Sequence, residues 1–165
     1  MAHHHLQAGC DPTGTSAGLI DRRRPSTNRV AGRRSPPPAP RLDAAWTAIV
    51  ADLRAHELAG LPLVTGGRSS GARVACRTAG ATGAVGVLCL AFPLQPAARA
   101  GATPRPSRLP ELEAVGVPVL IVQGERDPFG MPEAAPGRGV VRVSGDHSLK
   151  ADMARQREAV GAGLA

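Results

Sequence analysis

Aromatic residues are scarce in this 165-residue chain, which has no tyrosine, two phenylalanines and one tryptophan. Lysine is scarcer than arginine, because Lys150 is the only lysine among the 20 Lys and Arg residues. A surface that binds nucleic acid often combines basic residues with aromatic rings that stack on bases. The shortage of aromatic rings therefore argues against nucleic-acid binding, and a protein tethered to nucleic acid by its Arg-rich N-terminus is kept only as a minor alternative.

The chain also lacks a long apolar run and a cysteine framework. Its longest apolar run, residues 84–94, is too short to span a bilayer, and no signal-peptide pattern is present. Cys10, Cys76 and Cys89 are an odd number of cysteines without a C-x-x-C pair, which excludes a disulfide framework and a zinc knuckle. The tract His3 to His5 has no converging partners for a metal. We expect a soluble, cytoplasmic protein with reduced, buried thiols and with neither a metal nor a cofactor.

The first 41 residues differ in composition from the remainder. They carry seven arginines against two aspartates, which is +5 of the total net charge of +7, and they include the Pro-rich run at 35–40. Such a composition favours irregular or polyproline II chain. We predict an irregular Arg/Pro-rich segment at 1–41, with a short edge strand at 17–20 as its one element, and a single folded domain at 42–165.

The apolar pattern of the second segment alternates between helices and buried strands. Apolar residues recur at three- and four-residue steps from Leu42 to Leu58, which predicts a helix that ends near Gly60 and anchors Trp46 in the core. Further helices are expected at 70–79, ended by Gly80, and at 152–160, and strands are expected at 61–65, 85–91, 117–123 and 140–143. This alternation indicates an α/β fold with a mostly parallel sheet flanked by helices.

Ligands bind such sheets at the carboxyl ends of the strands, so polar residues just after strands are the candidate site residues. Gly67-Arg68-Ser69-Ser70-Gly71 matches G-x-S-x-G between a predicted strand and a predicted helix, the context of a nucleophile elbow. We predict Ser69, and not Ser70, as the nucleophile, the Ser70 backbone N–H as an oxyanion donor, and a steric need for both glycines. The alternative is that Ser69 is only a helix N-cap.

Two more polar residues follow predicted strands. Asp127 comes after the strand at 117–123, where it is either the acid of a triad or an Asp-Pro turn former, and Glu125 competes for the same role. His147 comes after the last strand, where it is either a general base or a solvated loop residue, with Asp146 as a cap of the next turn. The chain order Ser69, Asp127, His147 is that of Ser-acid-His hydrolases and indicates acyl transfer.

These residues resemble small α/β-hydrolases of the dienelactone-hydrolase-like kind, in the branch of testis-expressed and histone-acetyltransferase-complex hydrolase-like proteins. The resemblance runs from about residue 29 to 160 and depends on four segments, at 66–75, 91–94, 122–130 and 145–149. It implies an α/β-hydrolase fold and a triad of Ser69, Asp127 and His147.

The sequence departs from that branch in two places. Residues 1–28 show neither the front strands nor the His-Gly-x-Gly loop that supplies a second oxyanion donor, and Gln95 stands where many relatives have a histidine. We therefore expect an incomplete α/β-hydrolase fold, an exposed sheet edge open to self-association, and impaired activity. The predicted function is a serine hydrolase that cleaves a small-molecule carboxylic ester or related acyl substrate. The alternative is a non-catalytic or truncated hydrolase-like interaction module.

Overall fold

The computed structural model of the protein describes residues 37–96, 101, 103 and 105–163. The predictions of an edge strand at 17–20 and of a missing oxyanion loop at 1–28 lie outside these residues, as do Cys10 and the histidine tract. From Pro38 onward the chain forms one compact unit. The division at residue 41 into an irregular segment and a domain stays a prediction.

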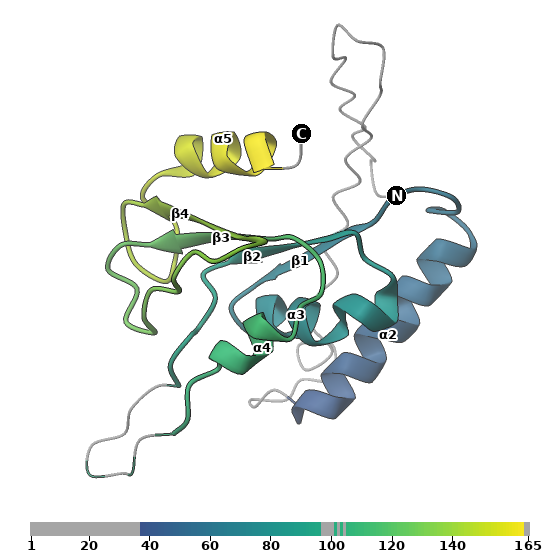
Figure 1. Ribbon diagram of the computed structural model, residues 1–165, viewed down its shortest axis with the longest axis horizontal. Coiled ribbons are helices and arrows are strands. Elements are labelled where there is room, and N and C mark those ends of the chain that lie inside the picture. The colour runs from purple at the N-terminus through teal and green to yellow at the C-terminus, as the bar shows by residue number, and fades with distance from the viewer. Residues whose placement is uncertain (1–36, 97–100, 102, 104, 164–165) are drawn as a thin grey trace, which may run out of the picture. The chain divides into compact units, whose positions relative to one another are not determined.

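The unit is built on a four-stranded sheet in the order β1-β2-β3-β4, with every neighbouring pair parallel (Figure 1). The strands are β1 (Val64–Arg68), β2 (Gly86–Leu90), β3 (Val119–Gly124) and β4 (Arg138–Val143). The predicted α/β class with a parallel sheet is therefore confirmed. All four carboxyl ends lie at one edge of the sheet, which is where the candidate residues follow β1, β3 and β4.

Helices cover both faces of the sheet (Figure 1). They are α2 (Ala39–Ala55), α3 (Ser70–Thr82), α4 (Leu109–Glu113) and α5 (Met153–Gly163). Helices α2, α3 and α4 lie on one side of the sheet, called the first face, and α5 lies on the other (Figure 1). One core cluster joins α3 and α4 to the first face, with Phe92 and Ile121 fully buried in it. A second, smaller cluster around Val122 and Leu149 packs under α5. The sheet thus has an apolar layer on each side, as its near-continuous apolar strands predict.

Several predicted boundaries are shifted. Helix α2 begins at Ala39, with a proline in its first turn where no N–H is needed, and it ends at Ala55. Helix α3 continues through Gly80 to Thr82, and the next residue, Gly83, is a left-handed C-cap with φ 62°. The predicted core anchor Trp46 is only half-buried. Strand β1 lies at Val64–Arg68, and not at 61–65, because its two glycines are strand residues.

Strand β1 is at one end of the strand order, and within the described residues it pairs with β2 alone. The Leu63 carbonyl accepts a hydrogen bond from Val85, and the Ser69 N–H donates one to Leu90 of β2. Because backbone groups alternate in direction along a strand, those of Val64, Gly66 and Arg68 point away from β2. Val64 is also 42% exposed. Within the described residues β1 is thus the end strand of the sheet, and both an exposed edge and self-association through it stay predictions.

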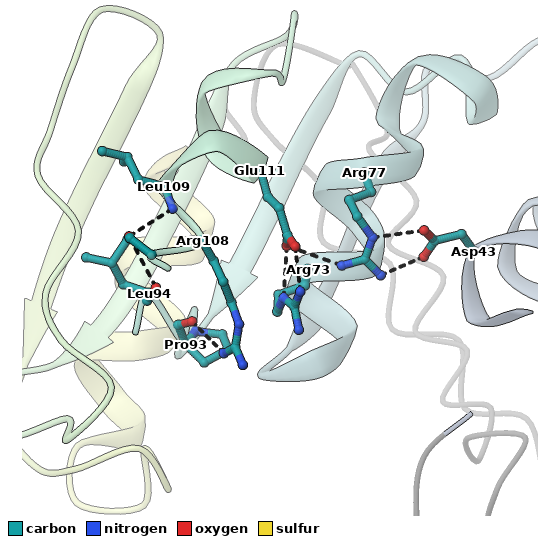
Figure 2. A network of polar contacts seen from close by, with 9 residues as sticks. Asp43, Arg73, Arg77, Pro93, Leu94, Arg108, Leu109 and Glu111 are labelled. Atoms are coloured by element: carbon teal, nitrogen blue, oxygen red, sulfur yellow. Dashed lines mark hydrogen bonds and ion pairs between the residues drawn. The ribbon is translucent and has the colours of Figure 1, made fainter. Parts of the chain in front are cut away.

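A charged network fastens the three helices of the first face to one another (Figure 2). Arg77 of α3 binds both carboxylate oxygens of Asp43 from α2, at 2.8 and 2.7 Å. Arg73, one turn earlier, donates from Nε to Glu111 of α4 at 2.9 Å, and Arg77 also reaches Glu111 at 3.2 Å. Burial disfavours the Glu111 carboxylate, but the two arginines outweigh it, so the pKa of Glu111 lies below its ordinary value.

Helix α4 was not predicted, because it lies at the end of a Pro-containing loop. The Ser107 hydroxyl accepts a hydrogen bond from the Leu109 N–H at 3.1 Å at its start, and Pro110 occupies its first turn. Arg108 donates to the Pro93 carbonyl at 2.8 Å and closes the base of the loop (Figure 2). Burial, together with the nearby charge of Arg73, lowers the pKa of Arg108. Within the described residues no helix is long and apolar enough to cross a membrane.

Candidate active site

Ser69 lies at the sharp turn between β1 and α3. Its backbone has φ 54° and ψ −114°, a strained conformation for a residue with a side chain, and its N–H binds the Leu90 carbonyl at 2.9 Å. The turn brings Gly67 against the start of the helix, where an added Cβ would lie 2.4 Å from the carbonyl carbon of Gly71. Position 67 therefore admits only glycine, as predicted for an elbow.

The predicted steric need for the second glycine of the motif is wrong. An added Cβ at Gly71 would meet no atom within 4 Å among the described residues. Gly71 is the second residue of α3, and its side-chain position is open. The close contact of the elbow comes from the backbone of Gly71, against which Gly67 packs, and not from the missing Cβ of Gly71.

The Ser69 side chain makes a hydrogen bond to a residue far away in the sequence. Its Oγ lies 2.9 Å from Nε2 of His147. It makes no capping hydrogen bond to α3, so the interpretation of Ser69 as a helix N-cap is not supported. Ser70 is the first residue of α3 and is exposed. The Ser70 N–H has no intrahelical acceptor at that position, which leaves it available to bind an oxyanion.

Asp127 lies just after β3 and holds the other nitrogen of the imidazole. Its Oδ2 lies 2.8 Å from Nδ1 of His147, and its side chain has no exposed surface. Its Oδ1 accepts from the Phe129 N–H at 2.9 Å, so Asp127 also forms the turn that the alternative interpretation proposed. The competing Glu125 is exposed, and it is Asp127 that contacts His147.

The His147 ring is fixed by packing as well as by hydrogen bonds. The Phe129 ring meets it edge-on, with the centroids 4.5 Å apart and the planes at 68°. The side chain is 21% exposed, so it is neither buried nor a freely solvated loop residue. Asp146 accepts from the Ser148 N–H at 2.8 Å and caps the turn, and this hydrogen bonding lowers the pKa of Asp146.

Gln123 is a site residue that the sequence reasoning missed. It is fully buried in β3, and its Nε2 donates to Oδ2 of Asp127 at 2.9 Å and to the Gly130 carbonyl at 2.9 Å. A further contact of 3.1 Å joins Nε2 to the Phe92 carbonyl. A polar residue at the end of an otherwise apolar strand, four residues before the candidate acid, was the signal that could have found it.

Gln95, the second departure from the resembling branch, lies beside the site. Its N–H donates to the Phe129 carbonyl at 2.7 Å, and Phe129 in turn packs on His147. Gln95 is exposed, so its side chain is open to solvent.

Neither a metal nor a reactive thiol is indicated in the described part of the chain. It contains no group of three His, Cys, Asp or Glu side chains that could hold a metal ion. Cys76 and Cys89 are free and buried, as predicted, with their Sγ atoms 3.5 Å apart. The hydrogen bond to Cys76 and burial raise the pKa of the Cys89 thiol, so it is not a nucleophile at neutral pH.

Two surface hollows of about 490 and 470 Å³ lie away from these residues. The first is between α3 and α4 and the second is along β4, and neither is lined by Ser69, Asp127 or His147. Ser69, His147 and Asp127, which are joined by hydrogen bonds, lie instead at the carboxyl edge of the sheet, where ligands of α/β proteins bind.

A parallel sheet with a serine at a strand-to-helix elbow defines the class of α/β-hydrolase-like proteins. The sequence profile of the alpha/beta hydrolase domain matches residues 24–160. The chain belongs to this alpha/beta hydrolase domain family. A comparison with curated proteins gave no match.

The chain is similar in fold to several solved structures. An α/β serine hydrolase homologue from Coxiella burnetii has a TM-score of 0.58 at 17% identity, covering 81% of this chain and 63% of that one. A Xanthomonas campestris protein described as an α/β serine hydrolase without a lid has a TM-score of 0.59 at 19% identity, covering 80% and 59%. The thioesterase domain from the curacin biosynthetic pathway has a TM-score of 0.51 at 17% identity, covering 74% and 72%.

The chain therefore spans 63% and 59% of the lengths of the first two structures. At these identities the likeness shows the fold alone, so the chemistry of this chain has to be argued from its own residues.

Proposed function

We propose that the protein is a serine hydrolase that cleaves a carboxylic ester or related acyl substrate through an acyl-enzyme. The observation that carries the proposal is the series of two hydrogen bonds, from Ser69 Oγ to His147 Nε2 at 2.9 Å and from His147 Nδ1 to Asp127 Oδ2 at 2.8 Å. A nucleophile, a base and an orienting acid within hydrogen-bond reach are what acyl transfer by serine needs.

In the proposed reaction, His147 takes the proton of Ser69 as its Oγ attacks the substrate carbonyl carbon. The imidazolium that forms is stabilised by Asp127, whose carboxylate is held by the Phe129 N–H and by Gln123. Nε2 then donates the proton to the leaving alcohol as the carbonyl–oxygen bond breaks and the acyl-enzyme forms. Water, activated by the same imidazole, attacks the acyl carbon and releases the acid and free Ser69.

The Ser70 N–H supplies one hydrogen bond to the oxyanion of each tetrahedral intermediate. Its place at the first turn of α3 adds the favourable field of a helix N-terminus. We propose a slow enzyme on the expectation that residues 1–28 supply no second donor, since loss of one donor of an oxyanion hole typically costs about 10² to 10³ in turnover.

We further place the protein in the dienelactone-hydrolase-like branch. The segment Gly66 to Ala75, which carries the resemblance, contains the elbow, and Gln123 to Gly130 contains the buried acid and its two hydrogen-bond donors. The substrate would be a small-molecule ester. The free Cys76 and Cys89 thiols, close together without a bond between them, support a reducing compartment such as the cytoplasm.

The test is hydrolysis of p-nitrophenyl acetate by the purified protein and by two serine variants. Ser69→Ala should lower kcat by at least about 10³, because the variant has no nucleophile. Ser144→Ala, at an exposed serine just after β4, is the matched control and should retain the activity of the unchanged protein. Turnover that survives Ser69→Ala would contradict the proposal. Absence of turnover in a folded protein would favour the non-catalytic interaction module.

A further inference from the structure

Arg68 makes a contact that neither the triad nor the packing of the sheet explains. It is the last residue of β1 and directly precedes Ser69. Its Nη2 donates a hydrogen bond of 3.0 Å to the backbone carbonyl of His147. The side chain that precedes the nucleophile thus holds the backbone of the base, 79 residues further along the chain.

The loop that carries His147 is held on both sides of the histidine, by the Arg126 N–H on the Gly145 carbonyl at 2.9 Å and by Nε2 of Gln156 on the Leu149 carbonyl at 2.6 Å, and Arg68 binds it at the histidine itself. Both Gly145, with φ 113°, and Leu149, with φ 50°, are in the left-handed region, so the loop turns sharply on either side of the histidine. The ring is held by Asp127, Ser69 and Phe129, but none of these contacts involves the backbone of His147, for which the described residues give one hydrogen bond, that from Arg68. Arg68 donates the hydrogen bond to the His147 carbonyl from the end of β1, the strand that directly precedes Ser69.

We propose that Arg68 is a positioning residue, which ties the His147 loop to the end of β1 and so keeps Nε2 within hydrogen-bond reach of Ser69. This inference rests on the proposed function, because it assigns Arg68 to the same Ser69 and His147 pair. Arg68 touches no reacting atom in this role. It acts on the distance between the nucleophile and the base through the backbone of the loop.

The position and chemistry of Arg68 favour this role over a purely structural one. The residue is exposed, so its hydrogen bond contributes little to the core. The guanidinium presents several donors at the end of a long side chain, which suits a contact between the end of β1 and the His147 loop. A misplacement of about 1 Å at a catalytic group is enough to cost about 10² in rate. Loss of Arg68 should therefore reduce catalysis far more than it reduces stability.

The kinetic test compares Arg68→Ala, Arg68→Lys and Arg157→Ala, the last at an exposed arginine of α5. With p-nitrophenyl acetate, Arg68→Ala should lower kcat by about 10- to 100-fold and change KM by less than about 2-fold, because substrate binding is unaffected. Arg68→Lys, which keeps one donor, should be intermediate, and Arg157→Ala should be unchanged. Added guanidinium ion at low millimolar concentration should restore part of the activity of Arg68→Ala alone, a response that a purely structural role would not give.

Hydrogen–deuterium exchange of the same proteins separates this inference from the proposed function. The segment 144–150 should exchange faster in Arg68→Ala, while β2 and β3 should exchange as in the unchanged protein. If the unchanged protein has no esterase activity, the proposed function fails, but faster exchange in this segment would still support the contact as the support of the loop. Unchanged exchange, or kcat equal to that of Arg157→Ala in an active protein, would overturn the role of Arg68.

Discussion

Nε2 of His147 lies 2.9 Å from Oγ of Ser69, although 78 positions separate the two residues and they follow strands at opposite ends of the described sheet. Three strand spacings, about 14 Å, separate the axes of β1 and β4. The loop after β4 therefore has to cross the carboxyl ends of the strands between them. It passes over the end of β3, where an added Cβ on Gly124 would lie 2.5 Å from the Asp146 carbonyl oxygen.

Gly124→Ala should therefore displace the loop that carries His147. We expect kcat to fall by about 10² or more, because the base would move away from Ser69 by an ångström or so. Stability should fall by about 1 to 3 kcal/mol, which is typical of overpacking. Gly139→Ala in β4 is the control, since its added Cβ would meet side-chain carbon at an ordinary 3.7 Å. Ester hydrolysis and urea unfolding measure both effects, and a fully active Gly124→Ala would show that the loop does not depend on this crossing.

The two glycines of the G-x-S-x-G motif should respond in opposite ways to alanine. Gly67→Ala places a Cβ 2.4 Å from the backbone of Gly71 and should prevent the elbow from forming, with loss of activity and of folded protein. Gly71→Ala meets open space in a helix, where alanine is favoured over glycine by up to about 1 kcal/mol, so it should be tolerated. Thermal unfolding and soluble yield compare the two variants. Equal damage from both would mean that position 71 is filled in the folded protein.

Asp127→Asn should impair catalysis much more than Glu125→Gln. The asparagine amide would still fit beside the imidazole, but it would not stabilise the imidazolium, and such a change typically costs about 10⁴ in kcat. Glu125 is an exposed residue, while Asp127 contacts the ring at 2.8 Å. Steady-state kinetics on a p-nitrophenyl ester distinguishes the two carboxylates. A larger loss in Glu125→Gln would transfer the role of the acid to Glu125.

The stability contributed by Glu111 should depend on pH. Burial raises the pKa of Glu111, but Arg73 and Arg77 outweigh burial, so the pKa is lowered in the folded protein. The ionised carboxylate therefore stabilises the fold fully above its ordinary pKa of 4.5, and this stabilisation is lost as the pH falls toward the folded pKa. Glu111→Gln should lower the free energy of unfolding at pH 7 by about 1.5 to 3 kcal/mol, the range for hydrogen bonds to charged groups. The difference should shrink below pH 4.5. Denaturant unfolding at pH 7 and pH 3.5 measures it, and an equal difference at both values would contradict the account.

The order of helices and strands after residue 41 was predictable because each strand contains or overlaps a short apolar run, and α2 has apolar residues at three- and four-residue steps. The exception is α4, a five-residue helix. It was missed because Pro110, which lies in its first turn, was interpreted as part of an irregular loop. The shift of β1 has a different cause. Gly66 and Gly67 were interpreted as the end of the strand, whereas they belong to it. Gly66 lies close to Leu88 of β2, and Gly67 lies close to the start of α3.

The three candidate site residues were predictable from the sequence, but the residues that hold them in place were not. Ser69, Asp127 and His147 each follow a strand, and a parallel sheet brings such positions to one edge. Gln123 and Arg68 support them through contacts to Asp127 and to the His147 backbone, which depend on the paths of loops that no local pattern specifies. The absence of an N-terminal oxyanion loop stays a prediction, because residues 1–28 lie outside the described residues, and a substrate role of the loop with Gln95 is untested.

Labelling by a fluorophosphonate probe, followed by mass spectrometry of the peptides, tests the central claim most directly. The probe phosphonylates a serine only when a base activates it, so slow turnover does not hide a functioning nucleophile. We predict one label per chain on Ser69, absent in Ser69→Ala and strongly reduced in His147→Gln. A label on Ser70, or no label on the folded protein under conditions that modify a known serine esterase, would contradict the assignment of Ser69 as an activated nucleophile.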